Sequence, residues 1–187
     1  MSILDAQREM RRAFLGGFAG QLIAGVIWAA SAAFTLLAAP NVGIAVLFFG
    51  SMAIFPLTQG LLRLIGRPAK VGAENGLWAL GAQIAFTVPL NFLLVFAATF
   101  YRHDWFYPAA MIAVGAHYLP FVTLYGMRMF AVLGALLVGA GTALAMVGTP
   151  FLSFGGWLGA ALLIAFALIG RWQVLAEERG LNFTDGA

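Results

Sequence analysis

The chain has 187 residues, of which 63% are hydrophobic and only 9% are charged. Soluble domains carry about a quarter of their residues as Asp, Glu, Lys and Arg, so this charge is too sparse to cover a globule in water. The composition therefore excludes an ordinary soluble domain and predicts an integral membrane protein whose main partner is the lipid bilayer. The absence of cysteine excludes disulfides, thiolate metal sites and cysteine nucleophiles.

Charged residues divide the chain into long apolar segments, and a helix needs about 20 residues to cross the hydrocarbon core. The last charge-free segment, 129–170, is long enough for two helices, and Gly148-Thr149-Pro150 supplies a break within it. We therefore predict one all-α domain over 1–187, a polytopic bundle of six transmembrane helices. The predicted spans are 13–39, 41–65, 76–101, 106–127, 129–148 and 151–172.

The basic residues predict an orientation for this bundle. Only Arg102 falls on one side of a six-span arrangement, and the remaining Lys and Arg residues fall on the other. Because basic loops stay cytoplasmic, we expect both termini inside the cell, N-in and C-in. The aromatic run 105–107 beside Arg102 predicts an anchor at the outer interface, and Trp78 and Trp172 predict one at the inner interface. The net charge of +3 reflects these loops, and we expect no nucleic-acid partner.

The first residues predict a short amphipathic helix ahead of the first span. Ser2 and Asp5 have the spacing of a capping box, which is typical of a helix start. We expect Ile3, Leu4 and Met10 to face lipid.

The sequence lacks the residues that several kinds of catalysis and ion-coupled transport require. No Asp or Glu lies inside a predicted span, whereas ion- and proton-coupled transporters usually carry a buried acid. The zinc-protease motif His-Glu-x-x-His and the rhomboid motif Gly-x-Ser-Gly are missing. His103 lies about 21 Å along a helix from His117, too far for both to bind one haem. We therefore assign no catalytic residue, metal or cofactor, and we do not expect an enzyme.

Uncharged polar residues and prolines gather in the second, third and fourth spans. Pro56, Pro89 and Pro120 each remove an amide donor and predict helix kinks. Such groups near the bilayer midplane are typical of a binding or translocation site. The alternative is that they only form hydrogen bonds between helices. The residues that we expect to line a polar cavity are Gln59, Gln83, Thr87, Asn91, His117 and Tyr118.

Small residues predict close packing of the first and last spans. Gly16 and Gly20, like Gly155 and Gly159, have the Gly-x-x-x-Gly spacing that permits close helix contact or dimerisation. One face of the first span is small and polar and is expected to pack inward. Its residues are Gly17, Gln21, Ala24, Trp28, Ser31 and Thr35.

The middle of the chain resembles a known family. Residues 108–121 read Pro-Ala-Ala-Met-Ile-Ala-Val-Gly-Ala-His-Tyr-Leu-Pro-Phe, with the core Gly115-Ala-His117-x-x-Pro120. This stretch is similar to a segment of small bacterial membrane proteins catalogued as domain of unknown function 7010. The resemblance covers roughly residues 20–145 and implies a multi-span bacterial membrane protein. It implies no activity.

Two functions fit these observations. The first is a protein of the bacterial inner membrane that binds or passes a small neutral or amphiphilic molecule through the polar cavity. The second is a structural or accessory subunit that uses its Gly-rich faces to bind itself or another membrane protein.

Overall fold

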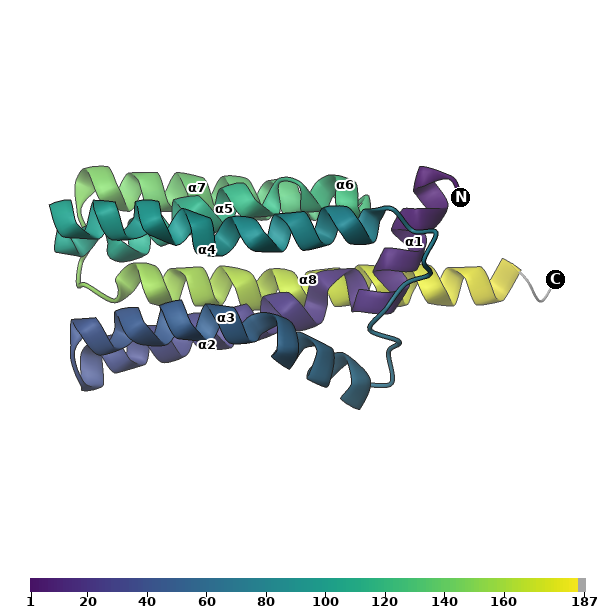
Figure 1. Ribbon diagram of the computed structural model, residues 1–187, viewed down its shortest axis with the longest axis horizontal. Helices are drawn as coiled ribbons and strands as arrows, with labels where there is room; N and C mark the ends of the chain where they lie inside the picture. Colours follow the sequence, from purple (N-terminus) through teal and green to yellow (C-terminus); the bar gives the residue numbers. More distant parts are fainter. Residues whose placement is uncertain (185–187) are drawn as a thin grey trace.

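In the part of the chain that the structure describes, six helical segments are long and apolar enough to cross a bilayer. They run side by side along the molecule, as Figure 1 shows. The computed structural model describes residues 1–184 and the side chains of residues 1–180, and it contains no strand among them. The all-α class predicted from composition is therefore confirmed. The helices are α1 (Ile3–Phe14), η1 (Leu15–Gly17), α2 (Phe18–Leu37), α3 (Pro40–Leu64), α4 (Leu77–Tyr101), η2 (His103–Trp105), α5 (Phe106–Tyr118), α6 (Phe121–Tyr125), α7 (Met129–Val147) and α8 (Phe154–Thr184).

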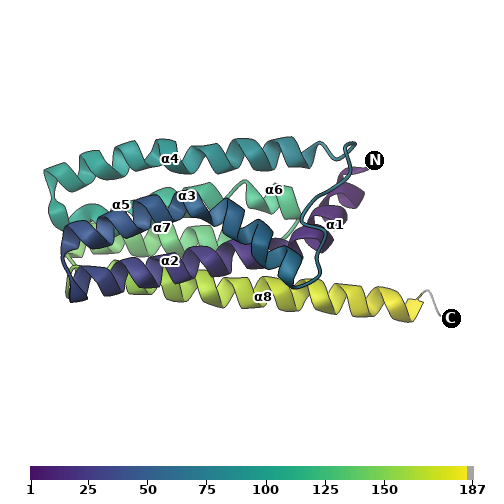
Figure 2. The same cartoon turned by 60° about the horizontal axis from the view of Figure 1, so that its bottom comes forward.

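The first predicted span, 13–39, is divided in the structure because the chain bends sharply before α2. Leu15, Gly16 and Gly17 have φ values of 48°, 59° and 82°, in the left-handed region that interrupts a right-handed helix. The Leu15 N–H donates to the Arg11 carbonyl and closes α1. As a result α1 crosses the end of the bundle and does not continue into α2 (Figure 2).

The helix start predicted for α1 is confirmed. The Asp5 N–H donates to Ser2 Oγ at 3.2 Å, and Ser2 Oγ donates back to the Asp5 carboxylate at 2.6 Å. Ile3 and Leu4 are exposed. The expectation that Met10 faces lipid is wrong, because the bend turns this face of α1 against the bundle and leaves Met10 only 2% exposed.

The spanning helices form two groups that meet along α8. Helix α2 packs against α3 and α8, while α5 packs against α7 and α4. Helices α5 and α7 also contact α8, which joins the two groups (Figure 1). The inward face predicted for the first span is confirmed, since Gln21, Trp28 and Ser31 are at most 3% exposed.

Glycines permit the closest helix crossings. A Cβ at Gly115 or Gly134 would lie 2.9 Å from the carbonyl oxygen of the other, so α5 and α7 touch backbone to backbone. Gly155 faces Tyr107, and Gly159 faces Trp28 of the same chain. Gly155 and Gly159 of α8 are therefore occupied by packing within the chain.

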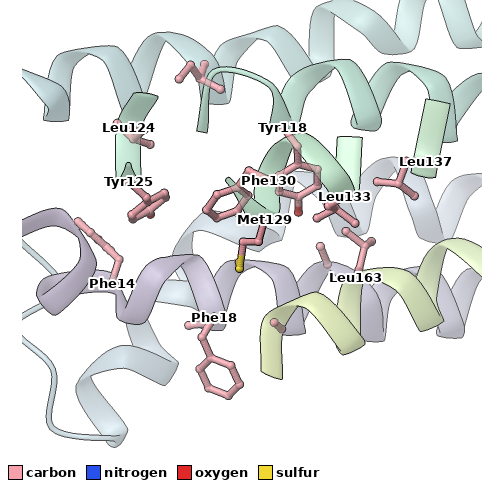
Figure 3. Packing of buried hydrophobic residues seen from close by; sticks show 14 of the residues in the cluster. Phe14, Phe18, Tyr118, Leu124, Tyr125, Met129, Phe130, Leu133, Leu137 and Leu163 are labelled. Carbon is pink, nitrogen blue, oxygen red and sulfur yellow. The ribbon is translucent and has the colours of Figure 1, made fainter. Parts of the chain in front are cut away.

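An aromatic cluster holds the second group together where α5, α6 and α7 converge. The Tyr118 ring stacks on Phe130 with centroids 6.0 Å apart, and Tyr125 stacks on the same ring at 5.4 Å. Figure 3 shows Tyr118, Phe130 and Tyr125 side by side, with Leu133 and Met129 next to them. This burial fixes the short α6 against α7.

A buried polar cluster fixes the opposite end of the bundle. The Tyr107 hydroxyl lies 2.8 Å from both Ser31 Oγ and Thr35 Oγ1, and Ser31 Oγ donates to the Gly43 carbonyl at 2.7 Å. The cluster therefore ties α5 to α2 and α3. The prediction that residues 105–107 form an interface anchor is wrong for Phe106 and Tyr107, which are 1% and 2% exposed. A buried tyrosine needs a partner for its hydroxyl, and here the partners lie inside the bundle.

Gly134→Ala is expected to destabilise the protein, because the new methyl group meets the rigid Gly115 backbone. Overpacking of this kind costs about 1–3 kcal/mol. Gly139→Ala is the matched control in α7, since a Cβ there meets nothing within 4 Å. Thermal unfolding in detergent checks both variants. Equal unfolding temperatures for the two would contradict the close α5–α7 crossing.

Tyr107→Phe is expected to lower the free energy of unfolding by about 0.6–1.7 kcal/mol, the range for a hydrogen bond between membrane helices. Tyr101→Phe is the control, because Tyr101 is 79% exposed. The same unfolding measurement should show a loss for Tyr107→Phe alone. A wild-type unfolding temperature for Tyr107→Phe would mean that the cluster does not hold α5.

Candidate functional site

One pair of the predicted polar residues meets directly, at the contact between α4 and α5. Thr87 Oγ1 donates to the Ile84 carbonyl at 2.7 Å and lies 3.1 Å from His117 Nδ1. The single hydroxyl proton of Thr87 points at Ile84, so the oxygen accepts from an Nδ1–H of His117. In a neutral imidazole the other nitrogen, Nε2, then carries a lone pair and accepts.

The free nitrogen of His117 is accessible. No described residue donates to His117 Nε2, and this atom is not among the buried polar atoms that lack a partner. The ring lies against Phe121, with centroids 5.1 Å apart, and is half-buried. Thr87 is exposed. The pair therefore presents an unused acceptor at the outer surface of the bundle, where hydrocarbon would lie.

Two further predicted residues lie on the same side of α4. Asn91 is half-buried and borders a void of about 10 Å³ between α4 and α5, together with Val88 and Ala113. Gln83 is exposed. We call the line formed by Gln83, Thr87, Asn91 and His117 the α4–α5 seam. A cavity needs at least about 10–15 Å³ to hold one water molecule, so the void has no room for a larger ligand.

The other predicted lining residues lie elsewhere. Gln59 is half-buried on α3, and its side chain forms no hydrogen bond with the seam among the described residues. Tyr118 is buried but faces Phe130 of α7. The structure thus gathers four of the six predicted residues at a surface seam and does not enclose them in a central cavity.

The three prolines differ in their effect. Pro56 and Pro89 lie within the continuous helices α3 and α4, whereas Pro120 separates α5 from α6. The Ala116 carbonyl, four residues before Pro120, accepts from the Leu119 N–H at 3.2 Å, so a tighter turn replaces the lost bond. This break lies directly after His117 and ends the helix at the seam.

The seam can bind a neutral group but offers little else chemically. Its helices α4 and α5 contain no Asp, Glu, Lys or Arg. Among the described residues, no group of three His, Asp or Glu side chains could hold a metal ion. What the seam provides is hydrogen bonding next to an apolar surface.

Polar contacts that sequence reasoning missed lie where α1 crosses the bundle. Arg11 forms a two-point ion pair with Glu177 of α8, with both N–O distances at 2.8 Å, and also donates to the Tyr125 carbonyl at 2.7 Å. Gln7 donates to the Thr123 carbonyl at 2.7 Å. Helix α1 therefore joins the end of α6 to α8, and we call this set the α1 clasp.

A second ion pair strengthens this end of the bundle. Arg67, in the segment after α3, binds the Glu178 carboxylate of α8 at 2.6 and 2.9 Å. The hydrogen bonds to Glu178 raise the pKa of Arg67, so the guanidinium stays charged. Both ion pairs join residues that are far apart in the sequence, so neither has a local sequence signal.

Comparison with known proteins identifies a family. The family model described as Family of unknown function (DUF7010) matches residues 3–173, which cover α1 to α7 and most of α8. No curated protein and no solved structure matches the chain. The match confirms the family that the resemblance around His117 indicated. The chain belongs to the family of unknown function DUF7010.

Proposed function

We propose that the protein binds a small neutral amphiphile from the bilayer at the α4–α5 seam. The observation that carries this proposal is the accessible, unpartnered Nε2 of His117. The ring is oriented by its other nitrogen, Nδ1, which lies 3.1 Å from Thr87 Oγ1. A polar atom facing hydrocarbon lacks water, so a ligand that donates a hydrogen bond is favoured there. Hydroxyl and amide groups on an apolar chain have this chemistry.

The surroundings of the pair suit an apolar chain better than a soluble ligand. Phe86, Leu90 and Leu94 of α4 are at least 64% exposed, which gives the ligand an apolar surface beside its hydrogen bond. With no charge on α4 or α5, the seam favours a neutral head group. Passage of the molecule across the membrane would require α4 to separate from α5, because the void between them is about 10 Å³.

The distribution of basic residues predicts the orientation of the protein in the membrane. Helix α1, the end of α3, the start of α7 and the C-terminal part of α8 meet at one end of the bundle (Figure 1), which we call the basic end. Nine of the ten basic residues belong to these segments or lie close to them in the sequence. By the positive-inside rule this end is cytoplasmic. We place the protein in a bacterial inner membrane with both termini inside the cell.

The accessory role receives less support from the packing. Gly155 and Gly159 already face Tyr107 and Trp28 of the same chain, so a partner could reach them only after the bundle opened. A second copy of the chain could also cover the seam in place of a lipid, and the labelling experiment below would detect it.

The proposal predicts site-specific labelling by a long-chain alcohol that carries a diazirine. In vesicles, photolysis should attach this probe mainly to residues 83–91 and 112–121, and unlabelled hexadecanol should compete. Hexadecyl methyl ether keeps the chain but cannot donate a hydrogen bond, so it should compete about 3- to 10-fold less well.

Two variants test the pair itself. His117→Phe keeps an aromatic ring without the acceptor, and Thr87→Val removes the hydroxyl that orients the ring; both should reduce labelling by a similar factor. Thr99→Val is the control on α4, since Thr99 Oγ1 donates only to the Val95 carbonyl. Uniform labelling around the bundle, or equal competition by alcohol and ether, would refute the proposal. Crosslinks between two chains at the seam would instead indicate a dimer.

A further inference from the structure

A second, chemically different site lies at the basic end. A pocket of about 720 Å³ opens between α1 and the segment 65–76 that connects α3 to α4. Its charged lining comprises Asp5, Arg8, Glu9, Arg12 and Lys70. The α4–α5 seam has no charged residue, whereas this pocket does. A ligand of the pocket must therefore differ in chemical class from the neutral ligand proposed for the seam.

The two walls of the pocket are held at a fixed separation. Glu9 accepts from the Gly72 N–H at 2.7 Å through one oxygen and from Asn75 Nδ2 at 2.8 Å through the other. Asn75 is 3% exposed and also donates to the Ala6 carbonyl at 3.1 Å. The connecting segment is thereby tied to α1 without a ligand, and the pocket is formed in advance.

The carboxylates of the pocket are already engaged, but two of its cations are not. Glu9 uses both oxygens on the opposite wall, and Asp5 accepts from Ser2 Oγ at 2.6 Å and lies 3.7 Å from Arg8. Arg12 and Lys70 form no ion pair with any described side chain. The unbalanced charge inside the pocket is therefore positive.

The position of the pocket matches the depth of lipid head groups. Helix α1 lies across the end of the bundle (Figures 1 and 2), with Ile3 and Leu4 exposed on it. Trp78 and Trp172 are 42% and 67% exposed near the same end, as expected for side chains at a membrane interface. Arg12 stands two residues before the end of α1. Phosphate groups of lipids lie at this level of a bilayer.

We propose that this pocket binds a phosphate group, with Arg12 and Lys70 as its ligands. Arginine and lysine together supply the charge-assisted hydrogen bonds that phosphate oxygens accept. The head group of an anionic phospholipid or a soluble phosphate compound could supply this group. Binding there would join α1 to the connecting segment and so reinforce the contact that Glu9 already makes.

The test is calorimetric titration of the full chain in a nonionic detergent with dihexanoyl phosphatidylglycerol, and separately with inorganic phosphate. The pocket variant is Arg12→Gln with Lys70→Gln. The control is Arg128→Gln with Arg179→Gln, which removes the same charge from exposed positions at the same end. Because all four side chains are exposed and without an ion pair, both variants should keep the wild-type unfolding temperature.

The expected result is one phosphatidylglycerol per chain, with the dissociation constant raised about 20-fold in the pocket variant and less than 3-fold in the control. If inorganic phosphate binds, phosphatidylglycerol does not, and the pocket variant weakens phosphate binding, the phosphate site is confirmed. Its natural ligand would then be a soluble phosphate compound. Equal weakening in both variants would show attraction to the basic end in general and would overturn the proposal. Absence of binding by both probes would overturn it as well.

Discussion

Hydrocarbon contains no water, so each polar group inside a membrane must find its partner within the protein. This constraint determines where the few polar side chains lie. At one end Tyr107 binds Ser31 and Thr35 inside the bundle, and at the other the charged residues of α1 bind α6 and α8. Between these ends the helices are joined by apolar packing and close glycine contacts. Some buried groups, among them the Gln21 amide and the Ser153 hydroxyl, have no hydrogen-bond partner among the described residues. At the surface, Thr87 satisfies one ring nitrogen of His117 and leaves the other free, and this incomplete pairing is why we propose a ligand at the seam.

The α1 clasp explains how two groups of helices form one bundle. Between the groups, α8 contacts α5 and α7, while α1 spans the basic end and binds both sides through Gln7 and Arg11. The bend at Leu15–Gly17 makes this possible, since a straight first helix would carry Arg11 away from Glu177. One helix thus has two roles. Arg11 closes the bundle, and Arg12, the next residue, is left free at the proposed phosphate site.

The sequence predicted the features that depend on local pattern. Long apolar runs indicated six spanning helices, Ser2 and Asp5 indicated the start of α1, and the region around His117 indicated the family. The polar residues of α4 share a face, as their i, i+4 and i+8 spacing requires, but spacing does not say whether that face points inward or to lipid. The local sequence predicts that Tyr107 lies at the interface, because nothing local reveals its partners on α2. Contacts between helices that are distant in the sequence could be found only in the structure.

We infer that the polar seam faces hydrocarbon and does not line a hydrated cavity. The chain has no cysteine, so single spin labels can be placed without background. Gln83→Cys lies on the seam one turn from Thr87, and Phe86→Cys, 73% exposed, is a reference on the apolar face at nearly the same depth. In bilayers, both labels should collide readily with oxygen and rarely with the water-soluble nickel–EDDA complex. Strong accessibility to nickel–EDDA at position 83 alone would contradict this inference, because it would show water at the seam.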